Sequence, residues 1–149
     1  MKENEYKLLD DFLYEAIFVQ EGAEAPSKSI LKDAELQVYV SDFGKKDDHC
    51  LVAEVEGKVV GAVWVRIMND YGHIDDEIPS SAISLYKDFR GLGIGTALMK
   101  DMIILLKEKG YKKTSLSVQK HNSACKLYLQ VGFKIVDEND EEYIMIREL

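Results

Sequence analysis

Three glycines alternate in the segment Arg90-Gly91-Leu92-Gly93-Ile94-Gly95-Thr96, which is the most chemically specific pattern in this 149-residue chain. The segment follows a short apolar run and precedes an amphipathic stretch, so it should join a strand to a helix. Glycine permits positive φ and lets the backbone approach a ligand closely. The first turn of the predicted helix lacks a carboxylate, and its free N–H groups, with Arg90 and Lys100 nearby, suit an anion such as a pyrophosphate.

Spacing separates the known kinds of anion-binding loop. A Walker A loop ends in Gly-Lys-Ser/Thr, whereas Gly95 is followed directly by Thr96. A dinucleotide fingerprint has the spacing Gly-x-Gly-x-x-Gly, and here the third glycine comes one residue early. The third kind is a pyrophosphate loop of the acyl-CoA type, and a glycine turn that serves only tight strand–helix packing is the simpler alternative.

Two segments resemble motifs of the GNAT superfamily of N-acetyltransferases. Arg90-x-x-Gly93-x-Gly95 resembles the acyl-CoA-binding signature Arg/Gln-x-x-Gly-x-Gly/Ala. Asn122-x-Ala124-x-x-x-Tyr128-x-x-x-Gly132-Phe133 resembles the family's downstream Asn-x-Ala-x-x-x-Tyr-x-x-x-Gly-Phe segment. The resemblance covers about residues 51–147, and it departs from the family at the amino end, where residues 1–6 leave almost no room for the usual first strand.

The resemblance implies a role for each matching residue in binding acetyl-CoA. The main-chain N–H groups of residues 90–96 would hold the pyrophosphate. Residues 83–87 would pair with the pantetheine arm like another strand, and the N–H of Leu85 would polarise the thioester carbonyl. Asn122 would bind the pantetheine, and Lys126 could reach the adenosine phosphate. The predicted cofactor-binding residues are Ile83, Leu85, Lys87, Arg90, Gly91, Leu92, Gly93, Ile94, Gly95, Thr96, Asn122 and Lys126.

Tyr128, Glu77 and Asp75 are the predicted catalytic residues. The resemblance implies that Tyr128 gives its proton to the leaving thiolate, and the alternative is a core aromatic side chain. A primary amine has a pKa near ~10.4 and must lose a proton before it attacks. Glu77 and Asp75 could attract the amine or take its proton, and a solvated acidic loop is the alternative. The three histidines lie in separate segments, so we expect no metal site.

The order of predicted elements indicates a mixed α/β fold of the α+β type. Helices are expected at about residues 6–19, 30–39, 96–109 and 122–131, from their apolar spacing. Strands are expected at about residues 51–55, 59–68, 82–85, 114–118, 133–137 and 143–146. The resemblance implies a single GNAT-like domain over residues 1–149. Its central sheet should be mixed and mostly antiparallel, flanked by helices, with the amino-terminal strand missing or replaced.

The composition of the chain excludes some classes of binding partner and predicts a cellular compartment. The chain has 27 acidic and 19 basic residues, a net charge of −8, which disfavours nucleic-acid binding because that depends on Lys and Arg. No apolar run approaches the ~20 residues that span a bilayer, so we expect no membrane association. Two cysteines are too few for a disulfide framework, and we expect a reduced, cytoplasmic protein.

These observations predict an N-acetyltransferase that moves the acetyl group of acetyl-CoA to a primary amine by direct attack. The acceptor would be a small molecule or a peptide, and the acidic surface favours a cationic one. The resemblance also suggests a homodimer, which is common in the family. The alternative is a non-catalytic module that binds or senses acyl-CoA.

Overall fold

The computed structural model describes residues 5–16, 37–67 and 77–149. Six strands form one sheet in the order β1-β2-β3-β4-β6-β5, and every neighbouring pair is antiparallel except β3 with β4. The strands are β1 (His49–Val55), β2 (Lys58–Arg66), β3 (Ser80–Leu85), β4 (Lys113–Gln119), β5 (Lys134–Glu138) and β6 (Glu142–Glu148). The helices are α1 (Leu8–Ala16), the 3-10 helix η3 (Lys87–Phe89), α3 (Ile94–Glu108) and α4 (Ala124–Gln130). The predicted fold class is therefore confirmed.

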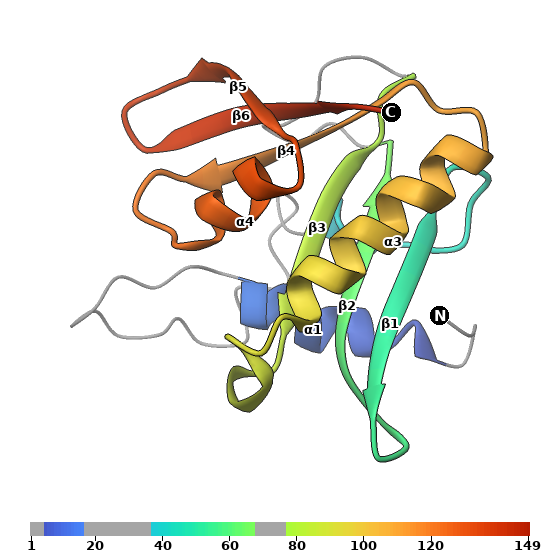
Figure 1. Cartoon of the computed structure of the whole chain (residues 1–149). Coiled ribbons are helices and arrows are strands. Elements are labelled where there is room, and N and C mark those ends of the chain that lie inside the picture. Colours follow the sequence, from blue (N-terminus) through green and yellow to red (C-terminus); the bar gives the residue numbers. More distant parts are fainter. Residues whose placement is uncertain (1–4, 17–36, 68–76) are drawn as a thin grey trace.

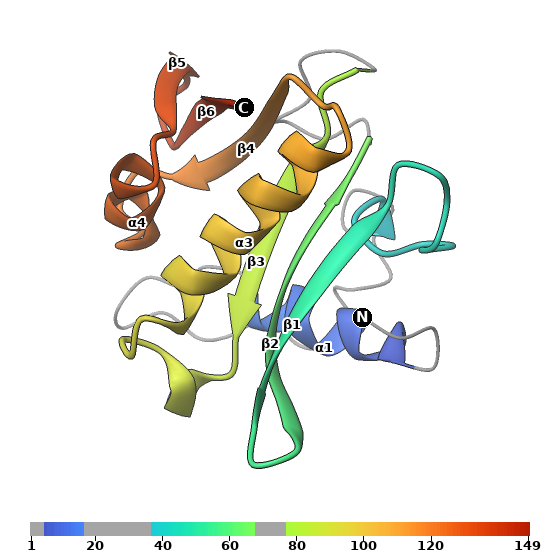
Figure 2. The ribbon, with the colours of Figure 1, turned by 45° about the vertical axis from the view of Figure 1, so that its right-hand side comes forward.

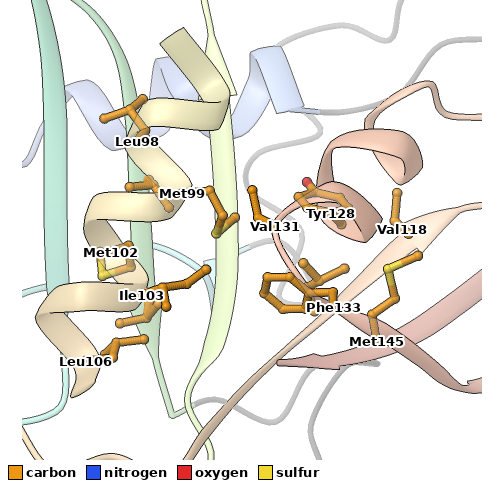
Figure 3. Close-up of a cluster of buried hydrophobic side chains, with 13 residues drawn as sticks. Leu98, Met99, Met102, Ile103, Leu106, Val118, Tyr128, Val131, Phe133 and Met145 are labelled. Atoms are coloured by element: carbon orange, nitrogen blue, oxygen red, sulfur yellow. The ribbon is translucent and has the colours of Figure 1, made fainter. Parts of the chain in front are cut away.

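Helices cover both faces of the sheet (Figures 1 and 2). The successive side chains of β2 point to opposite faces of the sheet. Because helices cover both faces, most residues of β2 are buried. Val63 and Val65 pack with α3 and α4, whereas Ala62 and Trp64 pack under α1. Figure 3 shows the first of these clusters, in which apolar side chains of α3 lie beside Tyr128, Val131 and Phe133.

Several predicted boundaries shift for local reasons. Helix α3 begins at Ile94, not Thr96, so the third glycine of the loop lies inside its first turn. Helix α4 begins at Ala124 because the Asn122 side-chain oxygen accepts the Ala124 N–H at 2.9 Å and forms a turn instead. Residues 38–42 form turns, so the predicted helix at 30–39 does not reach its expected end, and the rest of it lies outside the described residues.

The predicted absence of the first strand concerns residues 1–6, of which residues 1–4 lie outside the described residues, so it stays a prediction. Residues 5–16 contain α1 and no strand. Within the part of the chain that the structure describes, no helix has both the length and the apolar character needed to cross a membrane.

Candidate active site

Strands β3 and β4 are parallel neighbours that pair at a single position. Ser80 is opposite Ser115, and the Ser115 N–H donates to the Pro79 carbonyl oxygen at 3.0 Å. The Thr114 hydroxyl strengthens this end, because its Oγ1 lies 2.9 Å from the same carbonyl oxygen and 2.6 Å from Ser81 Oγ. Beyond this point the two strands diverge (Figure 1). The edge of β3 that faces β4 is therefore left without a strand partner along most of its length.

The main-chain groups of β3 point alternately toward β2 and toward β4. Leu85 is opposite Gly61, and the next residue, Tyr86, donates its N–H to the Val60 carbonyl oxygen at 2.9 Å. Because hydrogen-bonded and non-hydrogen-bonded pairs alternate in an antiparallel ladder, the even-numbered residues of β3 are the ones that hydrogen-bond to β2. The N–H groups of Ile83 and Leu85 therefore point toward the gap that opens beside β4.

The carbonyl oxygen of Leu85 accepts a hydrogen bond from Arg90 Nε at 3.0 Å. Its N–H has no such partner among the described residues, so it is the available hydrogen-bond donor at the end of β3.

The glycine loop leads directly into α3. Gly91 and Gly93 have φ of 76° and 85°, a conformation that glycine adopts at little cost. Gly93 is the N-cap of α3, with no side-chain cap and no acidic residue in the first turn. The first intrahelical bond joins the Ala97 N–H to the Gly93 carbonyl oxygen at 3.1 Å. The N–H groups of residues 94–96 thus have no intrahelical acceptor, which suits an anionic ligand.

Gly95 brings three elements together at the start of α3. A Cβ at this position would lie 3.2 Å from Leu127 Cδ1 of α4. On the side of β3 it would lie 3.6 Å from Leu85 Cδ1 and 3.8 Å from Ile83 Cδ1. A larger residue here would push α3 away from the gap between β3 and β4.

Tyr128 lies on α4 in the apolar cluster against which Ile83 and Leu85 also pack. Its side chain is 8% exposed, and its ring meets the Phe133 ring edge-on with centroids 5.9 Å apart (Figure 3). Burial raises the pKa of the phenol above its usual range. The hydroxyl makes no hydrogen bond with the residues that the structure describes, so at neutral pH it is a protonated donor available to a ligand.

Comparison with known proteins agrees with this geometry. The sequence profile of the acetyltransferase (GNAT) family matches residues 11–133. The chain belongs to the GNAT family. An N-alpha-acetyltransferase from Sulfurisphaera tokodaii is 32% identical over 114 residues, which cover 66% of this chain and 68% of that protein. A probable N-acetyltransferase, camello, from Xenopus tropicalis is 38% identical over 84 residues, 56% of this chain and 37% of the relative, so the chain spans about two fifths of that relative's length.

Solved structures share this GNAT fold over the whole chain. The PaiA N-acetyltransferase from Thermoplasma acidophilum, determined in complex with coenzyme A, superposes with a TM-score of 0.68 at 20% identity, covering 100% of this chain and 96% of that one. The ribosomal-protein-S18-alanine N-acetyltransferase from Escherichia coli gives a TM-score of 0.69 at 18% identity, covering 99% and 90%. At these identities the similarity establishes the fold.

The positive residues predicted to bind the cofactor differ in how they are held. Lys87, Lys100 and Lys126 are exposed. Arg90 is bound within the protein: besides Leu85 O, its guanidinium contacts the carbonyl oxygen and the carboxylate of Glu15, each at 3.1 Å. The resemblance to the GNAT signature identified Arg90 as a site residue. The contact between Arg90 and Glu15 of α1 could not be predicted from the sequence.

Asn122 and Cys125 occupy the start of α4. The Asn122 side-chain oxygen accepts the Ala124 N–H, and the amide NH₂ can donate to a ligand. The Cys125 thiol donates to the Gln119 carbonyl oxygen at 3.4 Å, and burial raises its pKa. A raised pKa disfavours the thiolate, which argues against an acyl-cysteine intermediate.

The predicted acidic residues lie apart from Leu85. Glu77 is exposed in the turn before β3, at the end where β3 and β4 are still paired. A strand rises about 3.3 Å per residue, so Leu85 is about 17 Å along β3 from Ser80. The structure therefore does not bring Glu77 to the Leu85 N–H, and Asp75 lies outside the described residues. Across the described ranges, no group of three or more His, Cys, Asp or Glu side chains is arranged to hold a metal ion.

Proposed function

We propose that this GNAT protein transfers the acetyl group of acetyl-CoA to a primary amine of a small molecule or peptide by direct attack. The observation that carries this proposal is the Leu85 N–H, which points into the gap beside β4 next to the open N–H groups of α3. The names of the relatives support the same class of reaction.

The residues around the gap fit acetyl-CoA, which would supply an activated acetyl thioester. The N–H of Arg90 donates to the Lys87 carbonyl oxygen at 3.3 Å, so of the predicted residues 90–96 those from Gly91 to Thr96 would bind the pyrophosphate. The N–H groups of residues 94–96 have no intrahelical acceptor, and no carboxylate opposes an anion there. The unpaired edge of β3 at Ile83 and Leu85 would bind the pantetheine as a further strand does. Lys87, Arg90, Lys100 and Lys126 would add positive charge, and Asn122 would donate its amide N–H.

Two groups of the protein would act on the charge that develops during transfer. The Leu85 N–H would hydrogen-bond the thioester oxygen, and one such fixed donor is worth about 3 to 4 kcal/mol of barrier. Tyr128 would donate to the leaving sulfur. Because its pKa is raised well above that of a thiol, near ~8.5, Tyr128 stabilises the thiolate by a hydrogen bond better than by complete proton transfer.

The acceptor we propose is a cationic amine, including the amino terminus of a peptide. The length of β3 separates Glu77 from Leu85, so Glu77 would not act at the thioester. Glu77 and Asp75 would instead attract the amine while it is still protonated. One relative, from Haemophilus influenzae, is a [ribosomal protein bS18]-alanine N-acetyltransferase. It is 37% identical over 68 residues, so a peptide amine belongs among the first candidates.

Thiol release from acetyl-CoA in the presence of polyamines, amino acids, aminoglycosides and amino-terminal peptides tests this proposal. Gly93→Val should abolish release, while Gly57→Val serves as the matched control. Gly57 has a similar φ of 81° and equally open surroundings, and it lies in the β1–β2 turn. Tight CoA binding with no thiol release from any amine would instead support a binding or sensing module.

A further inference from the structure

Gly61 lies inside β2, directly opposite Leu85 of β3. It is not one of the glycines with positive φ, so the backbone conformation does not require it. A glycine inside a strand is destabilising relative to alanine. Its presence at this position therefore needs another explanation, such as the close approach of a neighbouring group.

The space beside Gly61 is occupied by the Leu85 side chain. A Cβ at position 61 would lie 2.2 Å from Leu85 Cδ2 and 2.9 Å from the main-chain oxygen of Ser84. Gly61 and Leu85 form a non-hydrogen-bonded pair, in which opposite Cα atoms approach to about 4.5 Å. Leu85 can lie across β2 only because the opposite residue has no side chain.

Two further contacts limit where Leu85 can go. The first turn of α3 bounds its other methyl group, since Leu85 Cδ1 lies 3.6 Å from the position of a Cβ on Gly95. Arg90 Nε fixes the Leu85 carbonyl oxygen at 3.0 Å. Movement toward β2 or toward the start of α3 is therefore blocked, so a displaced Leu85 side chain would move toward the gap between β3 and β4 or would shift β3.

We propose that Gly61 is a positioning residue for acetyl transfer. By seating the Leu85 side chain on β2, it keeps the gap open and keeps the Leu85 N–H directed into it. This inference rests on the proposed function, in which that N–H polarises the thioester. A side chain at position 61 pushes Leu85 into the gap or shifts β3, and displacement of a catalytic group by about 1 Å can cost 10²-fold in rate.

The variant Gly61→Ala tests this role. We expect kcat to fall by roughly ten- to a hundred-fold. The Kd for CoA from calorimetry should rise by a smaller factor, because the pantetheine would lose space in the gap while the glycine loop that would bind the pyrophosphate is untouched. Val59→Ile is the matched control: it also adds one carbon to the same strand, at a half-buried residue that packs with the α1 cluster, and it should leave kcat unchanged. Thermal unfolding of both variants reports any general loss of stability.

The double variant Gly61→Ala/Leu85→Ala separates positioning from simple destabilisation. Leu85→Ala alone should lower kcat a few-fold, and the alanine at position 61 should then add little, because the colliding Cδ atoms are gone. We expect the double variant to exceed Gly61→Ala in kcat by at least about fivefold. A wild-type kcat in Gly61→Ala, or additive losses in the double variant, would overturn the inference.

A readout independent of turnover keeps this test distinct from that of the proposed function. The Leu85 amide resonance in an ¹H–¹⁵N spectrum should shift more with acetyl-CoA than with CoA in the wild type, and equally with both in Gly61→Ala. Equal shifts in the wild type would contradict the placement of the donor. If the wild type shows the larger shift with acetyl-CoA but acetylates no amine, the positioning role of Gly61 stands and the proposed acetyl transfer is refuted.

Discussion

The guanidinium of Arg90 joins the glycine loop to the first helix by contacting Glu15. Arg90 Nη2 lies 3.1 Å from the Glu15 carboxylate and 3.1 Å from its carbonyl oxygen, near the carboxyl end of α1. A cation at that end of a helix is favourable because the last carbonyl groups are partly negative. One residue of the GNAT signature thus connects the proposed pyrophosphate loop with a helix on the opposite face of the sheet.

Arg90→Ala should lower both CoA affinity and stability, whereas Lys87→Ala should lower CoA affinity alone. Both changes remove a positive charge near the loop, but only Arg90 also bonds to Leu85 and Glu15. Because the pair is partly exposed, we expect a loss of about 1 kcal/mol in unfolding free energy for Arg90→Ala. Calorimetric titration with CoA and urea unfolding measure the two effects, and equal stability of the two variants would contradict a structural role for Arg90.

Tyr128→Phe should lower kcat by about 10²-fold while CoA affinity and stability change little. The hydroxyl has no hydrogen-bond partner in the described part of the chain, so its removal breaks none there. Burial raises the pKa of Tyr128, so the protonated form persists, and kcat should show no loss from tyrosine ionisation up to about pH 10. A pH profile of kcat for wild type and variant checks this, and unchanged kcat in Tyr128→Phe would leave the residue as a core aromatic.

Sequence reasoning located the elements of this fold because their local signals agree with their tertiary roles. The β1–β2 hairpin, the helix after the glycine loop and the final hairpin each have the expected periodicity and a turn residue at the expected place. Asn139 illustrates the last case: its side-chain oxygen accepts the N–H groups of Glu141 and Glu142 at 2.8 and 2.7 Å. Such short-range chemistry is visible in sequence.

Contacts between distant segments were not visible in the same way. Nothing local indicates that Gly61 makes room for Leu85, 24 positions later, or that Arg90 reaches back to Glu15. Glu77 was selected for its chemistry and its place before β3, but the length of the strand separates it from Leu85. A residue type predicts what chemistry is available, whereas strand register and rise decide which groups meet.

Asp48→Ala should be among the most destabilising single changes in the described chain. Asp48 and Arg66 form a buried bidentate pair with side chains 4% and 6% exposed, at 3.2 Å and 3.1 Å. Removing the carboxylate leaves the Arg66 charge buried without its counter-ion, which typically costs 3 to 5 kcal/mol, so we expect about that loss in urea unfolding. Glu138→Gln, which removes an exposed partner of Lys120, is the control and should be near wild type. Similar midpoints for both variants would contradict this ranking.

His49 should make stability depend on pH just below neutrality. The His49 Nε2 lies 3.3 Å from the Tyr111 hydroxyl, which donates to Asp47 Oδ1 at 2.5 Å. Burial and then Lys109 lower the pKa of His49 against the opposing charges of Asp47 and Asp48. Burial and the bond to Asp47 raise the pKa of Tyr111 to about 12, so Tyr111 remains a donor throughout this range.

The sign of the effect follows from the lowered pKa. Below about pH 6.5 the unfolded histidine binds a proton more readily than the folded one, so the free energy of unfolding falls as the pH drops toward the folded pKa. Urea unfolding at pH 7.5 and pH 5.5 should therefore show a larger loss for wild type than for His49→Gln, which cannot titrate. Carboxylates remote from His49 contribute equally to both proteins and cancel in the comparison. A larger loss for the variant would mean that the aspartates outweigh burial and that the pKa of His49 is raised instead.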